Sequence, residues 1–427
     1  MPLRTKLKHW IRPLLFVGIF LVATAPFSII AQLTAHKKNG NFWPYFYNEV
    51  PQNSLDVVYV GNSHSKTTFI PGVIDHLLGT NSLQVSTVGE SIYQTQFEFE
   101  EVLRYQDPKL IILEANPIYS GLPTNDIRSW NYSFFYAMPF SVRKFFYAHG
   151  FFNDEDLLKF YLPFTSYHAD WKNPGQAKER RAEALETLKQ LIEADWHFDL
   201  PYQGYENYLV SLPLDTELDP DMEADDCPIL DFEERLAITE SILQNAKEDN
   251  QPVVIMETPQ FVNPFARCRD QVVELAANFG VEYVPLMEND ARPPLWFGDD
   301  EHMTQFGALR ASVETAQYLA DTLDIAINKE MLEIYQRYFF SDYTLDQDGN
   351  AVTITLIPDN PQALADMHFD WYVRHKGESY LEEEGIGMLE LSFTLPETEG
   401  DYFIRVVMFD PAIHYYVRGG FSFDPKY

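Results

Sequence analysis

The stretch VVYVGNSH, residues 57–64, joins four apolar residues to Gly61, Asn62 and Ser63. A short apolar run that ends in a glycine is typical of a buried strand followed by a tight turn. A strand-to-helix turn of this kind exposes the serine hydroxyl above the edge of the sheet. The stretch therefore predicts a strand, a turn and a helix start, with Ser63 at the carboxyl end of the strand.

Short apolar runs alternate with helical stretches from Ser54 to Asp324, and this pattern is typical of a parallel sheet covered by helices. One expected helix, residues 231–250, has Asp231 as N-cap with Glu234 three residues later, and another covers residues 304–321. The expected strands are Asp56–Val60, Leu83–Ser86, Leu110–Ala115, Pro252–Glu257 and Val281–Pro285. These elements predict an α/β domain over residues 37–328.

An insertion at about residues 117–230 interrupts the α/β rhythm. It is rich in Phe, Tyr and Trp, and it contains a polar helix at about 176–194 and an acidic run at 215–226. We interpret the acidic run as a solvated loop, because it lacks the turn glycine and closing glutamate of an EF-hand calcium loop. Three roles are open for the aromatic residues: a substrate-shaping lid, a packing core, or docking on a membrane or a membrane partner.

The pattern changes period near the C-terminus. After a short helical connector at 329–342, residues 352–356 and 389–395 alternate strictly between apolar and polar side chains. This alternation is typical of strands with one buried face. Residues 343–427 are therefore expected to form a small antiparallel β-sandwich domain.

The first 36 residues have the composition of a membrane-targeting segment. Four basic residues precede residues 14–35, which carry no charge and are long enough to cross a bilayer as a helix. We expect a retained single-pass transmembrane helix, with the amino terminus in the cytoplasm and the bulk of the chain extracytoplasmic. A cleaved signal peptide is the alternative, since residues 23–25 read Ala-Thr-Ala, but Pro26 directly after them argues against cutting there.

Charge and cysteine content narrow the function classes. The formal net charge of −33 argues against nucleic-acid binding, because such a surface repels phosphate backbones. Cys227 and Cys268 are the only cysteines, and sequence alone leaves open whether they pair. No spacing of His, Cys and Asp suits zinc, and no glycine-rich loop suits a nucleotide, so neither a metal nor another cofactor is expected.

A second short motif supplies partners for Ser63. Residues 299–302 read DDEH, which places Asp299 three residues before His302 and directly before a helix. A serine hydroxyl needs a base to take its proton, and the base works best when a carboxylate fixes its tautomer. Strand ends of a parallel sheet meet at one edge, so Ser63, His302 and Asp299 are candidate nucleophile, base and orienting acid. Oxyanion donors are expected from the backbone N–H of Ser63 and from Gly89 and Asn116, which follow the second and third strands.

Over residues 54–324 this order of motifs resembles the SGNH (GDSL-like) hydrolase superfamily. The matches are Ser63, Gly89, Asn116, Asp299 and His302, and the run DDEHMTQFGA at 299–308 carries the resemblance best. Asn62 stands where the family motif has Asp, and EANP at 114–117 replaces the family's Gly-x-Asn-Asp. The resemblance implies a flavodoxin-like three-layer fold and a serine hydrolase site.

Within that superfamily, the membrane segment, the GNSHS form and the long insertion resemble exported proteins that work beside membrane-bound O-acyltransferases, as in alginate O-acetylation and D-alanyl-lipoteichoic acid transfer. The resemblance implies an esterase or O-acyltransferase that acts on cell-envelope polysaccharide through an acyl-serine intermediate. The alternative is a non-catalytic assembly or carbohydrate-binding component of an O-acylation complex, with a vestigial serine site.

Overall fold

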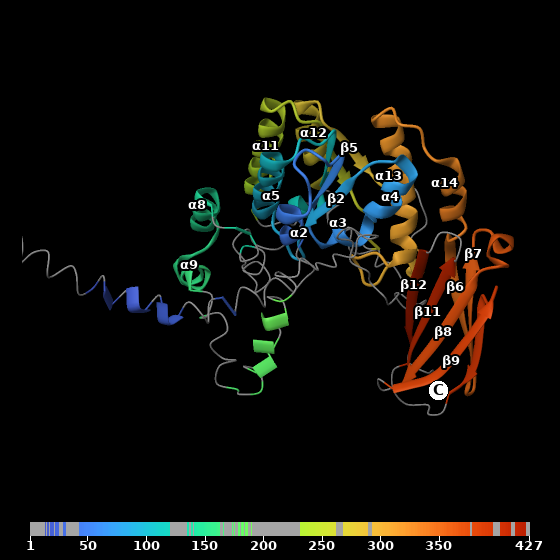
Figure 1. Cartoon of the computed structure of the whole chain (residues 1–427). Coiled ribbons are helices and arrows are strands. Elements are labelled where there is room, and N and C mark those ends of the chain that lie inside the picture. Colours follow the sequence, from blue (N-terminus) through green and yellow to red (C-terminus); the bar gives the residue numbers. More distant parts are fainter. Residues whose placement is uncertain are drawn as a thin grey trace, which may run out of the picture. The chain divides into compact units, whose positions relative to one another are not determined.

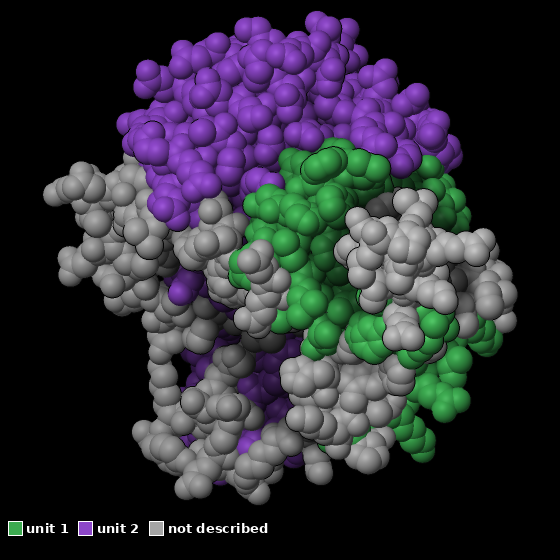
Figure 2. Space-filling view, turned by 90° about the vertical axis from the view of Figure 1, so that its left-hand side faces the viewer, with its two compact units in different colours: residues 1–50, 125–198 green, residues 51–124, 199–427 purple. Residues whose placement is uncertain are grey.

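The computed structural model describes residues 42–119, 141–162, 231–261, 268–288, 293–375, 378–395, 402–410 and 415–423, with scattered positions in 13–30, 135–139 and 165–189. The chain forms two compact units, coloured separately in Figure 2. One comprises residues 1–50 and 125–198, and the other comprises residues 51–124 and 199–427. The second unit contains the parallel sheet, the C-terminal strands and every residue expected at the site.

Five parallel strands form the central sheet of the second unit, as the sequence predicts. They are β1 (Val57–Gly61), β2 (Ser82–Ser86), β3 (Leu110–Glu114), β4 (Val253–Glu257) and β5 (Glu282–Pro285). Their order across the sheet is β2-β1-β3-β4-β5, and each neighbouring pair is parallel. This is one of the two common orders of doubly wound α/β sheets, in which ligands bind at the carboxyl ends of the strands.

Helices cover both faces of the sheet, which explains why its strands are continuous apolar runs. One set, to the right in Figure 1, is α3 (Ser63–Thr68), α4 (Pro71–Leu78) and α13 (Gln305–Thr322). The other is α5 (Ile92–Tyr105), α11 (Phe232–Glu248) and α12 (Arg269–Phe279), and the short α6 (Asn116–Tyr119) follows β3. Every residue of β1, β2 and β3 is buried.

The expected capping box of α11 is wrong. Asp231 does occupy the N-cap position, but its backbone lies in the left-handed region at φ +62° and its side chain accepts no capping hydrogen bond. Glu233 and Glu234 in the first turn still favour the positive end of the helix dipole. The acidic residues thus mark the start of the helix through their charge and not through a capping hydrogen bond.

Apart from residues 117–119, which lie in α6 of the second unit, the described part of the aromatic insertion lies in the first unit. It contains α8 (Val142–Phe151) and α9 (Asp154–Tyr161). Phe135, Phe152 and Phe160 pack ring against ring, with centroids 5.3 to 5.9 Å apart. These phenylalanines are a packing core, one of the three roles open for the insertion. The remaining aromatic residues expected there, Trp130, Tyr132, Phe134, Tyr136, Trp171 and Trp196, and most of the helix at 176–194 lie outside the described residues.

The N-terminal expectations fall mostly outside the described residues. Much of 14–35 is not described, and the described part of the chain includes no helix with the length and apolar character needed to span a bilayer. Further along, α2 (Trp43–Asn48) is a short aromatic helix in which Trp43 and Phe46 are buried.

The C-terminal region is β-rich, as expected, and consists of two antiparallel sheets. The strand order is β10-β7-β6 in one sheet and β12-β11-β8-β9 in the other. Inward-facing residues of both sheets belong to one hydrophobic cluster, and the rings of Tyr343 and Phe421 lie 4.4 Å apart between the sheets. The strands are β6 (Phe340–Asp348), β7 (Ala351–Pro358), β8 (His368–His375), β9 (Glu378–Ile386), β10 (Glu390–Thr394), β11 (Tyr402–Asp410) and β12 (Tyr415–Phe423).

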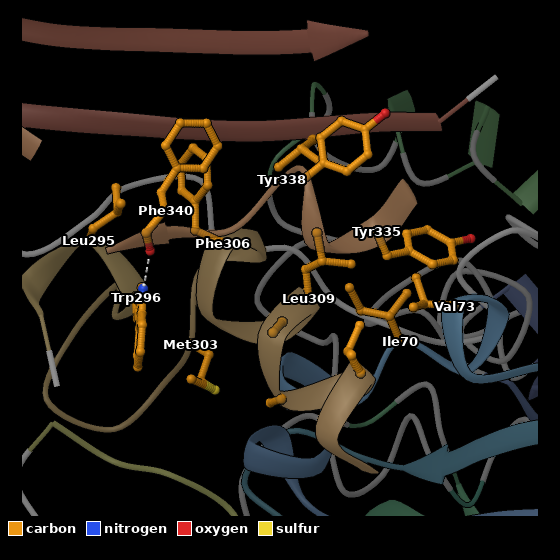
Figure 3. Packing of buried hydrophobic residues seen from close by; sticks show 14 of the residues in the cluster. Ile70, Val73, Leu295, Trp296, Met303, Phe306, Leu309, Tyr335, Tyr338 and Phe340 are labelled. Carbon is orange, nitrogen blue, oxygen red and sulfur yellow. Dashed lines mark hydrogen bonds between the residues drawn. The ribbon is translucent and has the colours of Figure 1, made fainter. Parts of the chain in front are cut away.

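The connecting helix α14 covers Lys329–Gln336, and β6 begins at Phe340. Trp296, in a 3-10 turn directly before the DDEH motif, donates its indole N–H to the backbone oxygen of Phe340 at 2.7 Å (Figure 3). The Arg310 guanidinium lies 4.7 Å from the Trp296 ring centroid and 4.5 Å from that of Phe339, and it pairs with Asp359. The β-rich region is therefore packed directly against the segment that carries the motif.

Cys268, at the start of α12, is buried and disulfide-bonded. Cys227, the other cysteine of the sequence, lies outside the described residues.

Candidate active site

The fold brings Ser63, His302 and Asp299 into a hydrogen-bonded series, although Ser63 and His302 are 239 residues apart in sequence. His302 Nε2 lies 2.8 Å from Ser63 Oγ. His302 Nδ1 lies 2.9 Å from both carboxylate oxygens of Asp299. This is the connectivity of a serine nucleophile, a histidine base and an orienting acid.

Ser63 lies in the tight turn between β1 and α3. It is the first residue of α3, and the side chain of Asn62 caps the helix by accepting a hydrogen bond from the backbone N–H of His64 at 3.0 Å. A Cβ on Gly61 would lie 2.6 Å from Cβ of Glu114 on the neighbouring strand β3. Only glycine fits there, so Gly61 is required for the close approach of β1 and β3 below the serine.

The loop at 297–303 is closed on itself and fixes the acid and the base. Phe297 and Met303 form an antiparallel bridge, and the N–H of Gly298 donates to the oxygen of His302 at 2.8 Å. Asp299 Oδ1 also accepts backbone N–H bonds from Glu301 at 2.9 Å and from His302 at 2.7 Å. The His302 ring therefore points toward Ser63 because its own backbone and its Asp299 partner are both held.

Burial by itself raises the pKa of the Asp299 carboxyl, but the hydrogen bonds from His302 and from the two backbone N–H groups outweigh it and lower the pKa below its ordinary value. Asp299 is thus ionised at neutral pH. An ionised partner keeps the His302 proton on Nδ1 and leaves the Nε2 lone pair facing the serine hydroxyl.

Helix α13 begins immediately after this loop and packs tightly against the preceding turn. A Cβ on Gly307 would lie 2.6 Å from the backbone oxygen of Trp296. Thr304 closes the same corner, with its N–H bonded to Trp296 O at 2.8 Å and its hydroxyl to Leu295 O at 2.7 Å. The Gly-Ala pair of the motif thus has a packing role: it lets the helix approach the turn that supports His302.

Of the expected oxyanion donors, Asn116 contacts the residue directly before Ser63. It follows β3 in α6, is 4% exposed, and accepts a 2.6 Å hydrogen bond at Oδ1 from the side chain of Asn62. Its side-chain nitrogen is then the end of the amide that can donate. The change from the family's Gly-x-Asn-Asp pattern therefore leaves an asparagine amide next to residue 62.

Gly89 lies in the loop between β2 and α5, at the same carboxyl edge, with a left-handed backbone at φ +65°. Two buried acids that the sequence reading did not single out support this loop. Glu90 accepts the N–H of Thr87 at 2.9 Å and the hydroxyl of Thr95 at 2.7 Å, and Glu98 contacts Glu90. Burial raises the pKa of both carboxyls, so the pair retains a proton. The sequence signal was present, since Glu98 stands directly between Phe97 and Phe99 in a helix.

Glu114 is a fully buried acid directly under the site. Its Oε1 accepts the N–H of Asn116 at 2.8 Å and the hydroxyl of Thr258 at 3.0 Å, while Oε2 has no partner among the described residues. Burial raises its pKa to about 8. Glu114 thus joins the ends of β3 and β4 and fixes the backbone from which the Asn116 amide projects.

His64 and Glu301 stand beside the base. The rings of His64 and His302 have centroids 4.9 Å apart, and His64 Nε2 lies 3.6 Å from Glu301 Oε2. Burial lowers the pKa of His64 below its ordinary value, and the nearby His64 ring nitrogen lowers that of Glu301. A neutral imidazole and an ionised carboxylate therefore adjoin His302 at neutral pH.

No protein-family model and no curated protein matches the chain. A gut microbial diltiazem-metabolizing enzyme, BT4096, aligns over 78% of this chain and 71% of its own, with 7% identity and a TM-score of 0.22. Domains d3–d4 of the rat CD45 extracellular region align over 19% of this chain and 46% of theirs, with 12% identity and a TM-score of 0.16. Pectate lyase Pel3 from Pectobacterium carotovorum aligns over 20% and 28%, with 16% identity and a TM-score of 0.16. The chain thus spans less than half of the CD45 and pectate lyase chains, and likenesses this weak carry no argument about fold or function.

Proposed function

We propose that this protein is an SGNH-type serine esterase or O-acyltransferase. The observation that carries the proposal is the hydrogen-bonded series from Ser63 through His302 to Asp299 at the carboxyl edge of a parallel sheet. Three further features support it: the strand order, the position of Ser63 in a strand-to-helix turn, and the Asn116 amide beside residue 62.

The residues divide the chemistry as follows. Ser63 Oγ attacks the carbonyl carbon of an acyl ester while His302 Nε2 takes its proton, and Asp299 stabilises the imidazolium that forms. The oxyanion of the tetrahedral intermediate is stabilised by the backbone N–H of Ser63 and by donors from Gly89 and Asn116. His302 then gives the proton to the leaving alcohol, which leaves an acyl-serine. Water or a sugar hydroxyl takes the acyl group in the reverse sequence of proton transfers.

We propose that the substrates are acyl esters of cell-envelope polysaccharide, handled beside a membrane-bound O-acyltransferase. The motif resemblance and the basic-then-apolar amino terminus support this placement. The disulfide at Cys268 adds support, because disulfides persist in oxidising compartments outside the cytoplasm. The proposal therefore includes a single-pass anchor with the bulk of the chain extracytoplasmic.

Ester turnover tests the proposal. Wild-type protein is expected to hydrolyse a chromogenic acetate ester, and Ser63→Ala is expected to lose at least about a thousandfold in kcat/KM, since removal of a nucleophile leaves only residual catalysis. Ser91→Ala is the matched control, because Ser91 is also buried near this edge but its hydroxyl has no partner among the described residues. An equal loss of kcat/KM in both variants, or activity that survives in Ser63→Ala, would refute the proposal that Ser63 is the nucleophile of an esterase.

A further inference from the structure

We propose that His64, Glu301 and His302 form a binding site for a divalent transition-metal ion, best suited to Zn²⁺, and that the bound ion inhibits the serine site. Each residue offers one ligand atom, and the three atoms lie within 4.8 Å of one another. Metal–ligand bonds of about 2.0–2.2 Å place the ligands of a tetrahedral zinc about 3.4 Å apart. His64 Nε2 and Glu301 Oε2 are already 3.6 Å apart. Closing the site requires the remaining ligand pairs, which lie within 4.8 Å, to approach by about 1.4 Å at most.

The ligand types select a transition metal over magnesium or calcium. Two imidazoles and one carboxylate are a common zinc ligand set, with a fourth position left for water, whereas magnesium and calcium prefer oxygen ligands. His64 is buried, with 3% of its surface exposed. The chain's net charge of −33 raises the local concentration of any cation.

The contact between Asp299 and His302 favours metal binding at the other ring nitrogen. Histidines that ligate metals usually donate their second ring N–H to a carboxylate, which fixes the tautomer and strengthens the ligand. His302 Nδ1 has this partner in Asp299 at 2.9 Å. The Nε2 lone pair is thereby prepared for an electrophile, either the proton of Ser63 or a metal ion.

Inhibition follows from competition for this single lone pair. A metal on His302 Nε2 leaves the Ser63 hydroxyl without a base, since Nε2 lies 2.8 Å from Ser63 Oγ in the metal-free arrangement. This inhibitory part rests on the proposed function. The binding part does not, because it depends only on the three ligands.

Calorimetric titration of the full-length protein with Zn²⁺ at pH 7.5 tests the site. We expect one site of high affinity that His64→Gln and Glu301→Gln each weaken by at least about tenfold. Asp300→Asn is the matched control, since Asp300 is the exposed acid next to Glu301 and is not among the three ligands. Wild-type affinity in His64→Gln would overturn the site, because nonspecific cation binding to the acidic surface does not depend on that imidazole.

Labelling of Ser63 by a fluorophosphonate tests the inhibition. Zinc is expected to slow labelling of the wild type by at least about tenfold, EDTA to restore it, and zinc to have little effect on labelling of His64→Gln. Zinc binding without any labelling of the metal-free protein would refute the proposed function and leave the metal site standing. Labelling that zinc does not slow at saturation would refute the inhibition and leave the proposed function standing.

Discussion

At the scale of single residues, the side chain of Asp299 joins the loop at 297–303 to the His302 ring. One carboxylate accepts from the His302 ring and from two backbone N–H groups, so it shapes the loop and orients the base together. A substitution can therefore remove the charge of Asp299 while it retains the contacts with the loop backbone.

Asp299→Asn separates these effects. Asparagine retains Oδ1, which keeps the backbone contacts. It replaces Oδ2, which lies 2.9 Å from His302 Nδ1, by an uncharged N–H donor, and this favours the wrong tautomer of the ring. We expect kcat to fall by about two to four orders of magnitude with little change in the unfolding midpoint. Steady-state kinetics and thermal melts measure both. A large drop in the unfolding midpoint together with the lower kcat would contradict the role of Asp299 as the orienting acid.

Glu114 predicts a pH dependence of stability. Its pKa is raised by burial to about 8 in the folded protein, so between its unfolded value of 4.5 and that value the folded state binds more protons than the unfolded state. This group therefore makes stability fall as pH rises through that window.

Glu114→Gln removes this titration, because the glutamine side chain resembles the protonated acid. The unfolding midpoint of the variant, measured at pH 5 and pH 8, is expected to fall less between the two values than that of the wild type. Glu248→Gln, a substitution of an exposed acid at the end of α11, is expected to leave the wild-type difference unchanged. Parallel pH profiles for wild type and Glu114→Gln would show that Glu114 is not protonated in the fold.

Individual site residues were predictable from sequence where they stood in a motif at a strand end. The proximity of Ser63, Asp299 and His302 was predicted in this way, because the carboxyl ends of parallel strands converge. The grouping of His64 with Glu301 was not predictable, because residues 64 and 301 meet only when β1 and the loop before α13 come together. For the same reason the spacing along the chain gave no sign of the three proposed metal ligands.

At the scale of secondary-structure elements, the start of α13 determines where His302 lies. A side chain at position 307 would clash, because the helix there packs directly against the Trp296 backbone. The helix is also tied to the nucleophile side of the sheet: Ser312 Oγ accepts the N–H of Ile70 at 2.8 Å, directly before α4. The helix thus couples the two halves of the site mechanically.

Gly307→Ala tests this coupling. The added Cβ would lie 2.6 Å from Trp296 O, so either the helix or the turn must shift. Forcing extra atoms into a packed contact costs about 1–3 kcal/mol, and a shift of the loop also misplaces His302. We expect a lower unfolding midpoint and a lower kcat. Gln317→Ala, on the exposed face of the same helix, is the control, and a Gly307→Ala protein that behaves like it would contradict the packing role.

The type of each element was predictable, but some local causes were not. The five strands are continuous apolar runs because helices cover both faces of the sheet, and this signal survives in the sequence. The expected side-chain capping of α11 by Asp231 was wrong: the residue has a left-handed backbone and makes no capping hydrogen bond, and sequence spacing does not reveal either feature. The aromatic insertion had no clear period, so its phenylalanine core could not be distinguished from a lid.

At the scale of the whole molecule, the second unit contains one continuous hydrophobic cluster. It includes the sheet residues Tyr59 and Ile112 and residues of the β-rich C-terminal region. Figure 3 shows its part around Trp296, Phe306 and Phe340. Arg418 donates its backbone N–H to Gln305 Oε1 at 3.0 Å across the same junction. The β-rich region therefore supports the segment that carries Asp299 and His302.

This continuity predicts cooperative unfolding. In calorimetry of the full-length protein, the parallel sheet and the C-terminal sheets are expected to unfold in a single transition, because neither can lose the junction without exposing core. Trp296→Phe removes the indole donor and leaves the buried Phe340 oxygen without this hydrogen bond. We expect the variant's free energy of unfolding to fall by about 1–3 kcal/mol. Two resolved transitions, with the C-terminal strands melting separately at unchanged esterase activity, would show that the β-rich region does not support the site.

The most direct test of the central claim is whether Ser63 is an activated nucleophile. Full-length protein is treated with a fluorophosphonate at pH 7.5, and the adduct is located by peptide mass spectrometry. If Ser63 is an activated nucleophile, one adduct is expected, on the peptide that contains Ser63. This adduct is absent in Ser63→Ala and forms far more slowly in His302→Ala. An unlabelled wild type, or an adduct on another residue that persists in Ser63→Ala, would contradict it.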